Sequence, residues 1–323
     1  MHFRDLVIMS WRNLKRNKRR TVITAFSVAF GVLLSVTFTA SGDYSYTNMI
    51  NTSATMGFGH VTIQPQGYNK TPSLAKTITN SETLRKKVAG LAEVEGVFER
   101  IVGEAMFATG SKSIGGRFIG IDPGREKEKY NFFLRWINKG QLFAGGNSNE
   151  VVIGAKMAEK LKLDLGKKVI YTLSDKSGEM VSGIGRVRGI YESGDDSIDS
   201  GVVLLPIEKM REILGYGPDA STLMAVFIED QRLADEVRNT IADHIDMENR
   251  EVLTWKSTQA ELYSLVAMDR AGNYLMQFLV GLLIAAGILN TLLMSVMERT
   301  REFGMMMAVG MSPSKIVGMV IIE

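Results

Sequence analysis

The chain of 323 residues contains no cysteine, only three histidines and only six prolines. Without cysteine no disulfide can staple a small domain, so a folded part must be held by its own hydrophobic core. His2, His60 and His244 lie far apart in the sequence, without the spacing of zinc ligands. Proline breaks helix interiors, and its scarcity therefore favours long unbroken helices.

Motifs of common enzyme classes are also absent. No Gly-x-x-x-x-Gly-Lys-Ser/Thr phosphate-binding loop occurs, and the segment Gly110-Ser-Lys-Ser-Ile-Gly-Gly116 has the wrong spacing. There is no Gly-x-Ser-x-Gly nucleophile elbow. The acidic run Asp195 to Asp199 lacks the other ligands of a calcium loop, so we interpret it as a solvated turn. The chain is predicted to hold no catalytic, cofactor or metal site of its own.

Two long stretches, 21–42 and 271–297, contain no charged residue. A helix of about 20 apolar residues crosses the roughly 30 Å hydrocarbon core of a bilayer, so each stretch predicts a transmembrane helix. We set the first span at 21–43 and the second at 271–297. The roughly 230 residues between them are enough for an independent core.

Basic residues are concentrated on one side of each predicted span. Before the first span stand Arg4, Arg12, Lys15, Arg16, Lys18, Arg19 and Arg20, and the next basic residue is Lys70. Arg299, Arg301 and Lys315 follow the second span. Positive charge resists translocation, which predicts cytoplasmic ends and an extracytoplasmic domain between the spans. The net charge of +3 gives no indication of nucleic-acid binding.

Residues 1–20 combine this basic charge with apolar side chains at helical spacing: Phe3, Leu6, Val7, Trp11 and Leu14. The pattern predicts an amphipathic helix in the cytoplasmic membrane interface. Ala40-Ser-Gly42 resembles the cleavage site of a signal peptide, which is the alternative interpretation. The patterned region before the apolar core is too long for that alternative.

Residues 44–256 have the mixed patterns of an α+β domain. The segments 60–64, 94–109, 117–121, 166–173, 181–191, 201–205 and 223–228 are predicted strands. Helices are predicted over 154–161, 206–214 and 231–245, and after a capping box at Thr79-Asn-Ser-Glu82. A stalk helix over 257–270 leads into the second span. The predicted fold class is an α+β membrane protein with two full transmembrane helices flanking a large mixed α/β domain.

Small residues at four-residue steps predict close helix packing within the membrane. They are Ser27, Gly31 and Ser35 in the first span and Gly281 and Ala285 in the second. Chance is the alternative, because small residues are common in membrane helices. Asn290 lies well inside the second span, and a buried amide in lipid needs a partner. We therefore expect Asn290 to face another helix of a larger bundle.

A charged turn and a short methionine-rich helix follow the second span, over 298–311. Glu298, Arg299, Arg301 and Glu302 end the span, because charges are costly in lipid. Gly304 lies within a helix whose apolar surface is supplied by Phe303, Met306, Met307 and Val309, and Gly310 is a natural stop. Ser312-Pro313 then starts a third apolar helix over 312–323. We expect this third span to continue beyond Glu323.

Both ends of the chain resemble the MacB/FtsX permease family, which includes the LolC and LolE lipoprotein-release permeases. The resemblance lies in Trp11 to Thr21 and in the block Glu298-Arg-Thr-Arg-Glu-Phe-Gly304, followed by Ala308-Val-Gly-Met311 and an apolar helix ending in Glu323. In the outer domain, Glu150 to Gly154 and Asp199 to Glu208 match more loosely. FtsX itself is a poorer match, because its outer domain is much smaller.

The resemblance implies a type VII ABC transporter permease in a bacterial inner membrane, with a periplasmic core domain and four spans in all. It implies a partner cytoplasmic ATPase that holds ATP and Mg, a second permease subunit in a homo- or heterodimer, contact with membrane lipid, and a periplasmic chaperone or adaptor as a further candidate partner. The helix after the second span would be the coupling helix, passing ATP-driven motion to the periplasm (mechanotransmission). Lipoprotein release and export of a lipid, peptide or drug are the activities implied.

A two-span sensory receptor with a periplasmic ligand domain is the alternative function. Such a receptor continues after its second span into a signalling helix or kinase, whereas this chain turns and enters apolar sequence again at Pro313. That turn favours the permease. A membrane-anchored enzyme is least favoured, because no catalytic constellation is present.

Overall fold

The computed structural model describes residues 18–322, so the predicted interfacial helix over 1–20 lies almost entirely outside the described residues. The chain divides into two units. One comprises the residues up to Ser45 and those from Leu265 onward, and the other is Tyr46–Ser264. Each unit is described by itself.

The first unit is helical. It contains most of α2 (Lys18–Ser53) and α10 (Ala260–Glu298), followed by α11 (Thr300–Ala308) and α12 (Pro313–Ile322). Two candidate spans, Thr21–Phe58 and Ala260–Glu298, are long and apolar enough to cross a membrane. Thr24 lies beside Thr291 and Thr39 beside Gln277, so the two helices run antiparallel. The helix predicted from 257 begins at Ala260, after a break at Gln259.

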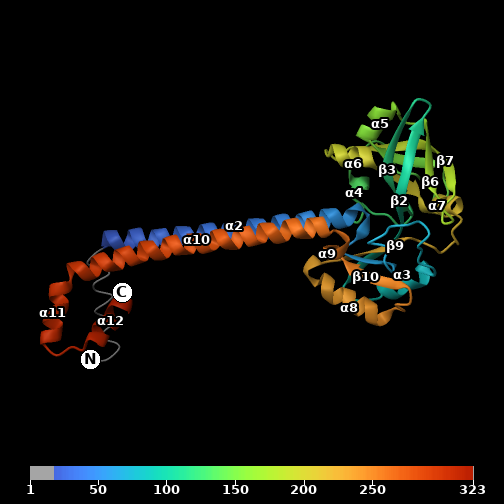
Figure 1. The fold of residues 1–323 in the computed structure, drawn as a ribbon. Helices are drawn as coiled ribbons and strands as arrows, with labels where there is room; N and C mark the ends of the chain where they lie inside the picture. The colour runs from blue at the N-terminus through green and yellow to red at the C-terminus, as the bar shows by residue number, and fades with distance from the viewer. Residues whose placement is uncertain (1–17, 323) are drawn as a thin grey trace. The chain divides into compact units, whose positions relative to one another are not determined.

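The second unit is a mixed α/β domain built on one extended sheet, with the strand order β10-β1-β9-β2-β3-β8-β5-β7-β4 (Figure 1). Its strands are β1 (Val61–Pro65), β2 (Val94–Thr109), β3 (Lys112–Ile121), β4 (Ile137–Gly140), β5 (Glu150–Gly154), β6 (Lys168–Ser174), β7 (Met180–Tyr191), β8 (Val202–Pro206), β9 (Leu223–Ile228) and β10 (Arg250–Thr254). Its helices are η1 (Ala54–Phe58), α3 (Ser81–Ala89), α4 (Phe132–Arg135), α5 (Ala155–Leu161), α6 (Asp196–Gly201), α7 (Ile207–Leu214), η2 (Gln231–Leu233), α8 (Ala234–His244) and α9 (Trp255–Thr258).

Strand β2 belongs to both halves of this domain. Its residues up to Arg100 pair with β9, and those from Ile101 pair with β3. Beyond this switch the pairings β2-β3-β8-β5-β7-β6 return to β2 and close a six-stranded ring. Phe107, Phe118 and Tyr171 are buried in the core of this ring. A closed ring has no free edge, so these strands protect one another.

Helices α3 and α8 share a second core with the four-stranded half, β10-β1-β9-β2. Leu84 and Val88 of α3 and Val237 and Ile241 of α8 are buried against Val226 and its neighbours in the sheet. A third core joins both halves through residues such as Phe98, Ile119 and Phe227. Residues from distant parts of the sequence thus hold the domain without disulfides.

Two local predictions are wrong. Thr79 does not cap α3: Asn80 stands at the N-cap without a side-chain bond, and Asp219 accepts the Glu82 N–H at 2.7 Å instead. The run Asp195 to Asp199 is not a solvated turn, because Asp195 caps helix α6 and Asp199 is buried. The Asp199 carboxylate accepts bonds from the Ser193 N–H and hydroxyl, which compensates its burial.

Candidate functional site

The helix pair of the first unit packs along a seam whose positions on α10 lie three or four residues apart. Within the second candidate span these half-buried or buried positions are Asn273, Gln277, Val280, Ile284, Ile288, Thr291 and Ser295, and Leu292 and Val296 are half-buried beside them. Gly31 is buried on α2, and a Cβ built on it would collide with Ile284 Cδ1. The Gln277 amide donates to Thr39 Oγ1 at 2.8 Å.

Some of the small residues predicted for packing lie in this seam, and others lie outside it. Gly31 lies in it and Ser35 is half-buried, whereas Ser27 is exposed and returns its hydroxyl to the Ile23 carbonyl. Gly281, Ala285 and Asn290 are exposed in the described part of the chain. A four-residue repeat drifts around a helix with 3.6 residues per turn, so only part of such a row can face one partner.

Replacing Gly31 with leucine is expected to destabilise the helix pair, because added side-chain atoms would overlap Ile284. Overpacking of this kind costs about 1–3 kcal/mol. Gly281→Leu is the matched control, since a Cβ at Gly281 meets nothing within 4 Å. Thermal unfolding of the two variants in detergent checks the prediction. Equal midpoints for both variants would mean that Gly31 is not a packing position.

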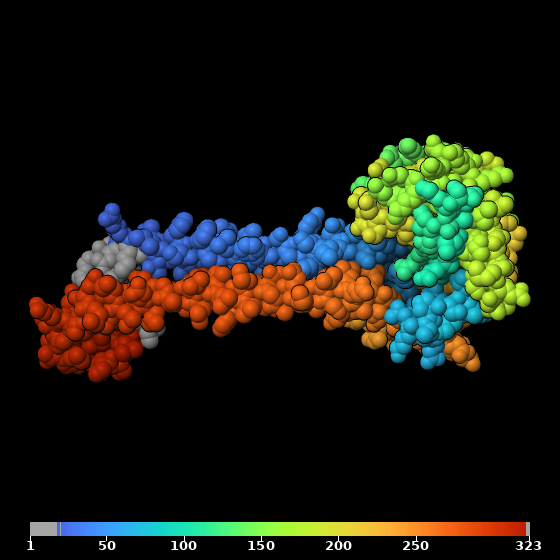
Figure 2. Space-filling model, turned by 45° about the horizontal axis from the view of Figure 1, so that its top comes forward, coloured from blue at the N-terminus to red at the C-terminus, as the bar shows by residue number. Residues whose placement is uncertain are grey.

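Helices α11 and α12 form a compact block after the second candidate span (Figure 2). Phe303, Ile316 and Met319 are buried together in it, with Met306 and Met311 packed at the edge. The Arg299 guanidinium lies 5.1 Å from the centre of the Phe303 ring and donates to Glu302 at 2.9 Å. The charged turn is therefore ordered around Phe303, whose side chain serves internal packing.

The outer face of this block carries the exposed apolar side chains. Met305 is 64% exposed, Met307 48% and Val309 90%. A hollow of about 410 Å³ lies beside them, lined by Met305, Met306, Val309, Gly310, Met311 and Lys315. Gly310 has a φ of +97°, which lets the chain turn between the two helices. Methionine is flexible and polarisable, and its exposure in clusters is typical of binding surfaces.

The coupling residues predicted from the sequence thus divide into two groups. Phe303 and Arg299 are buried, while Glu298, Arg301, Gly304, Met307 and Gly310 are exposed and Glu302 and Met306 are half-buried. Met305 was not among the predicted site residues, and its helical spacing of four from Val309 is the signal that joins it to them. Whether these residues contact an ATPase stays a prediction.

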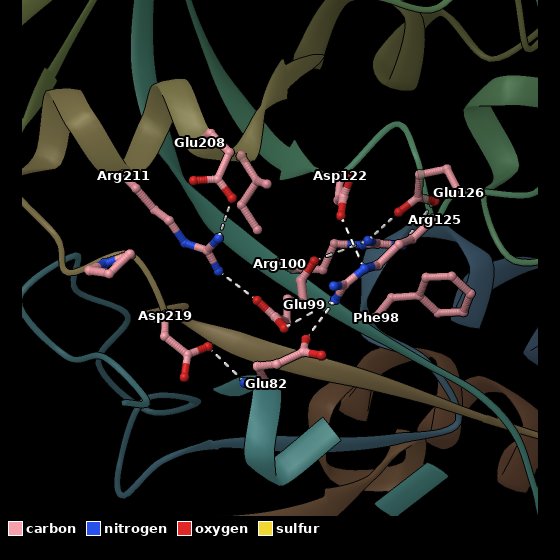
Figure 3. A pocket seen from close by; sticks show the side chains of 12 residues that line it. Glu82, Phe98, Glu99, Arg100, Asp122, Arg125, Glu126, Glu208, Arg211 and Asp219 are labelled. Atoms are coloured by element: carbon pink, nitrogen blue, oxygen red, sulfur yellow. Dashed lines mark hydrogen bonds and ion pairs between the residues drawn. The ribbon is translucent and has the colours of Figure 1, made fainter. Parts of the chain in front are cut away.

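The domain of the second unit contains a charged pocket of about 300 Å³ at the switch in β2 (Figure 3). It is lined by Glu82, Phe98, Glu99, Arg100, Asp122, Arg125, Glu126, Ile207, Glu208, Arg211, Pro218 and Asp219. Glu99 and Arg100 are consecutive residues of β2, one facing α7 and the other the loop after β3. The sequence signal that could have indicated this pocket is the adjacent opposite charges of Glu99 and Arg100 within a predicted strand.

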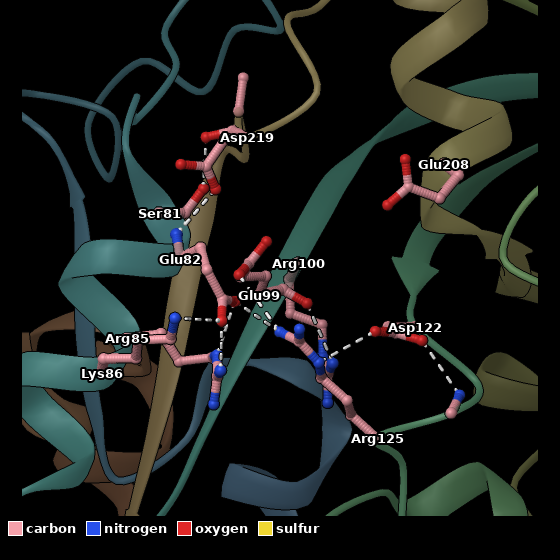
Figure 4. Close-up of polar contacts among 12 residues, drawn as sticks. Ser81, Glu82, Arg85, Lys86, Glu99, Arg100, Asp122, Arg125, Glu208 and Asp219 are labelled. Atoms are coloured by element: carbon pink, nitrogen blue, oxygen red, sulfur yellow. Dashed lines mark hydrogen bonds and ion pairs between the residues drawn. The ribbon is translucent and has the colours of Figure 1, made fainter.

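The charged groups of this pocket pair with one another (Figures 3 and 4). Arg211 bridges Glu99 at 2.5 Å and Glu208 at 2.7 Å, and buried Arg100 pairs with buried Glu126. Arg125 reaches Glu82 of α3 at 2.9 Å and Asp122 at 3.2 Å. Each guanidinium thus has a carboxylate partner, as expected of a structural network that joins α3, β2 and α7.

The electrostatics of α3 agree with that interpretation. Hydrogen bonds from Arg85, at 2.6 Å, and from Arg125 together outweigh the effect of burial and lower the pKa of Glu82 to about 2. Within residues 18–322 there is no group of three or more His, Cys, Asp and Glu side chains that could hold a metal ion. The pocket is therefore described by its ion pairs alone.

Two family models match the chain. The model of the MacB-like periplasmic core domain matches residues 21–244, which is more than half of the chain. The model of the FtsX-like permease C-terminal region matches residues 274–323. Together they include the first candidate span, most of the α/β domain, the part of the second candidate span from residue 274 onward, and the block formed by α11 and α12.

Individual relatives are distant but align along the whole chain. An ABC transporter permease of Methanocaldococcus jannaschii is 23% identical, covering 99% of this chain and 78% of the relative. The lipoprotein-releasing system transmembrane protein LolC of Xylella fastidiosa is 24% identical, covering 98% and 76%. The macrolide export ATP-binding/permease protein MacB of Brucella abortus is 25% identical over 99% of this chain, which spans about half (49%) of that relative. The crystal structure of the periplasmic region of MacB from Actinobacillus actinomycetemcomitans aligns with a TM-score of 0.44 and 15% identity, covering 64% of this chain and 94% of that one.

Proposed function

This chain belongs to the family of ABC transporter permeases with a MacB-like periplasmic core domain, and from that membership we propose that it couples ATP hydrolysis by a separate cytoplasmic ATPase subunit to movement of its α/β domain. In this proposal α2 and α10 cross a bacterial inner membrane, with the N-terminus in the cytoplasm and the α/β domain in the periplasm. The excess of Lys and Arg before α2 and after α10 supports that orientation.

The observation that carries the proposal is the apolar surface of α11. Met305, Met307 and Val309 project from a helix that follows the second candidate span, with the charged turn between them. An exposed methionine cluster beside a hollow of about 410 Å³ is suited to receive side chains of a partner. The phosphate-binding loop that an ATPase needs does not occur in residues 1–323, so the partner supplies ATP and Mg.

The proposed assembly has two permease subunits. Gly281, Ala285 and Asn290 are exposed on α10 outside its seam with α2, so they are available for a helix of a second subunit or for a further span. Relatives act in lipoprotein release, macrolide export and pyoverdine export, according to their names. Lipoprotein release, or export of a lipid, peptide or drug, is accordingly the proposed class of activity, with a periplasmic chaperone or adaptor as an additional partner.

Replacing Met305 or Met307 with aspartate is expected to weaken ATPase binding at least about tenfold, because an unpaired carboxylate would be buried at the interface. Binding is measured with the purified ATP-binding subunit encoded in the same genome and the permease in nanodiscs. Met180→Asp, at an exposed methionine of β7, is the matched control and should bind normally. Normal binding by Met305→Asp and Met307→Asp would contradict the assignment.

Phe303→Asp is a less suitable probe of the same interface. Phe303 is buried against Ile316 and Met319, so its replacement is expected to unpack α11 from α12 as well. Loss of binding in that variant would not distinguish a lost contact with the ATPase from misfolding of the block formed by α11 and α12. The exposed methionines avoid this difficulty because their side chains serve no internal packing.

A further inference from the structure

The two long helices join the α/β domain at adjacent strands but through different kinds of junction. Helix α2 leads through η1 into β1, and β10 leads through α9 into α10. Strands β1 and β10 are hydrogen-bonded neighbours, with Val61 opposite Thr254. A movement of either helix would therefore act on the same edge of the sheet. The hydrogen bonds and buried contacts at each junction determine how rigidly that movement is transmitted to the strands.

The junction of α2 contains a kink at Gly57 in η1, where φ is +126°, and is held by several buried contacts and hydrogen bonds. Ile50 near the end of α2 and Ala54 at the start of η1 are buried, and the Asn51 side chain lies 3.0 Å from His60 Nε2. The other ring nitrogen, Nδ1, accepts the Ile228 N–H at 3.2 Å. The His60 backbone donates to Val226 and accepts from Trp255, both at 2.9 Å. One residue thus ties α2 to β9 and to the start of α9.

Gly59 completes this junction. Its φ is +74°, and a Cβ built there would lie 2.6 Å from the Val226 nitrogen. The backbone can approach β9 this closely only without a side chain. Helix α2 is consequently held by buried apolar contacts, by a bridging imidazole and by direct backbone contact at once.

The junction of α10 is different. The helical dihedral angles are interrupted at Gln259, whose φ and ψ are −129° and 55°, while the bonds from Gln259 N–H to Trp255 and from Tyr263 N–H to Gln259 continue along the backbone. Both polar atoms of the Gln259 side chain and the Trp255 Nε1 are buried, without a hydrogen-bond partner among the described residues. Leu262, in the first turn of α10, is only partly buried in the core, and Tyr263 meets Trp255 edge to face with ring centres 6.0 Å apart.

Unpaired buried polar groups weaken a native arrangement relative to any alternative in which they find partners. Segments that combine few buried apolar contacts with such groups open locally at lower free energy than the core. At Gln259 both conditions occur at a break between two helices. At His60 neither occurs, because both ring nitrogens are bonded and Ile50, Ala54 and His60 itself are buried.

We propose that Gln259 is a flexible joint at which α10 moves relative to the α/β domain, whereas His60 is a rigid joint that keeps α2 fixed to the sheet. The two helices then have unequal tasks: α2 carries the domain with it, and α10 can shift along α2 without distorting β10. This asymmetry is independent of the proposed ATPase coupling, since it concerns motion of the permease chain alone.

Spin labels on the full chain in nanodiscs test the proposal, and the absence of native cysteine makes the labelling specific. One pair joins Asp243→Cys on α8 to Met268→Cys on α10, and the matched pair joins Asp243→Cys to Tyr44→Cys on α2; all three positions are exposed. We expect a broad distance distribution for the first pair and a narrow one for the second. Equal widths in the unmodified chain would overturn the proposal.

Gln259→Leu removes both unpaired atoms while keeping a similar volume. In this variant the first distribution should narrow toward the second, and the thermal midpoint should rise by about 2–4 °C. Gln64→Leu is the control, because the buried Gln64 amide donates to Glu251 at 2.7 Å and its loss should lower the midpoint. A broad distribution that persists in Gln259→Leu, or a midpoint lowered as in Gln64→Leu, would also overturn the proposal.

Discussion

Replacing Glu126 with glutamine is expected to lower the free energy of unfolding of the α/β domain by about 3–5 kcal/mol, the usual cost of breaking a buried ion pair from one side. The Glu126 side chain is 0% exposed and that of its partner Arg100 is 2% exposed. Glutamine keeps the shape but removes the charge, which leaves the Arg100 guanidinium buried without a counter-ion. Arg100 stands at the switch in β2, so the loss should be felt in both halves of the domain.

Arg125→Gln is the matched control, one residue away in the sequence. The Arg125 side chain is 45% exposed, and exposed pairs contribute about 0–1 kcal/mol. Urea unfolding followed by tryptophan fluorescence measures both variants. The double variant Arg100→Met with Glu126→Leu should recover much of the stability, because two apolar side chains need no counter-charge. Similar small losses for Glu126→Gln and Arg125→Gln would contradict the role of the buried pair.

Elements that depend on near neighbours were predictable from the sequence. Strand β1 follows from the alternation over 60–64, and α7 follows from the proline that precedes its first turn. The cap of α3 could not be predicted, because its acceptor, Asp219, is 137 residues from Glu82. A capping pattern such as Thr79-Asn-Ser-Glu82 shows only which nearby side chains are available to accept the first N–H groups of the helix. A carboxylate from a distant part of the chain can accept them instead.

The candidate site likewise has features that depend on the local sequence and features that depend on distant contacts. The methionine-rich helix and the new helix start at Pro313 follow from charge and capping patterns, and α11 and α12 lie within the segments 298–311 and 312–323 that these patterns indicate. These patterns do not predict which side chains of α11 are buried and which are exposed, because that depends on where α12 packs. Phe303 is buried by Ile316 and Met319, which leaves Met305 and Val309 on the outer face. Similarly, Glu99 and Arg100 acquire their roles only when α7 and the loop after β3 meet β2.

The rigid joint at His60 is expected to make the domain sensitive to acid in a defined pH range. Burial lowers the pKa of the His60 imidazole from 6.5 to about 4, and the Glu95 carboxylate opposes this only in part. The geometry agrees, because Nδ1 accepts the Ile228 N–H and must therefore be unprotonated while Nε2–H donates to Asn51. Protonation would place two N–H groups against each other at Ile228.

The sign of the effect follows from proton binding in the two states. Between pH 6.5 and pH 4 the unfolded chain protonates His60 and the folded domain does not, so the free energy of unfolding falls as the pH is lowered. The full loss is about 3.5 kcal/mol, given roughly 1.4 kcal/mol for each pKa unit. His60→Gln should flatten the stability profile in that range, whereas Glu82→Gln, which removes a carboxyl whose pKa is about 2, should alter it only below about pH 4.5. Urea unfolding at pH 7, 5.5 and 4.5, followed by tryptophan fluorescence, measures the dependence of the free energy of unfolding on pH. A dependence unchanged in His60→Gln would show that the imidazole does not control it.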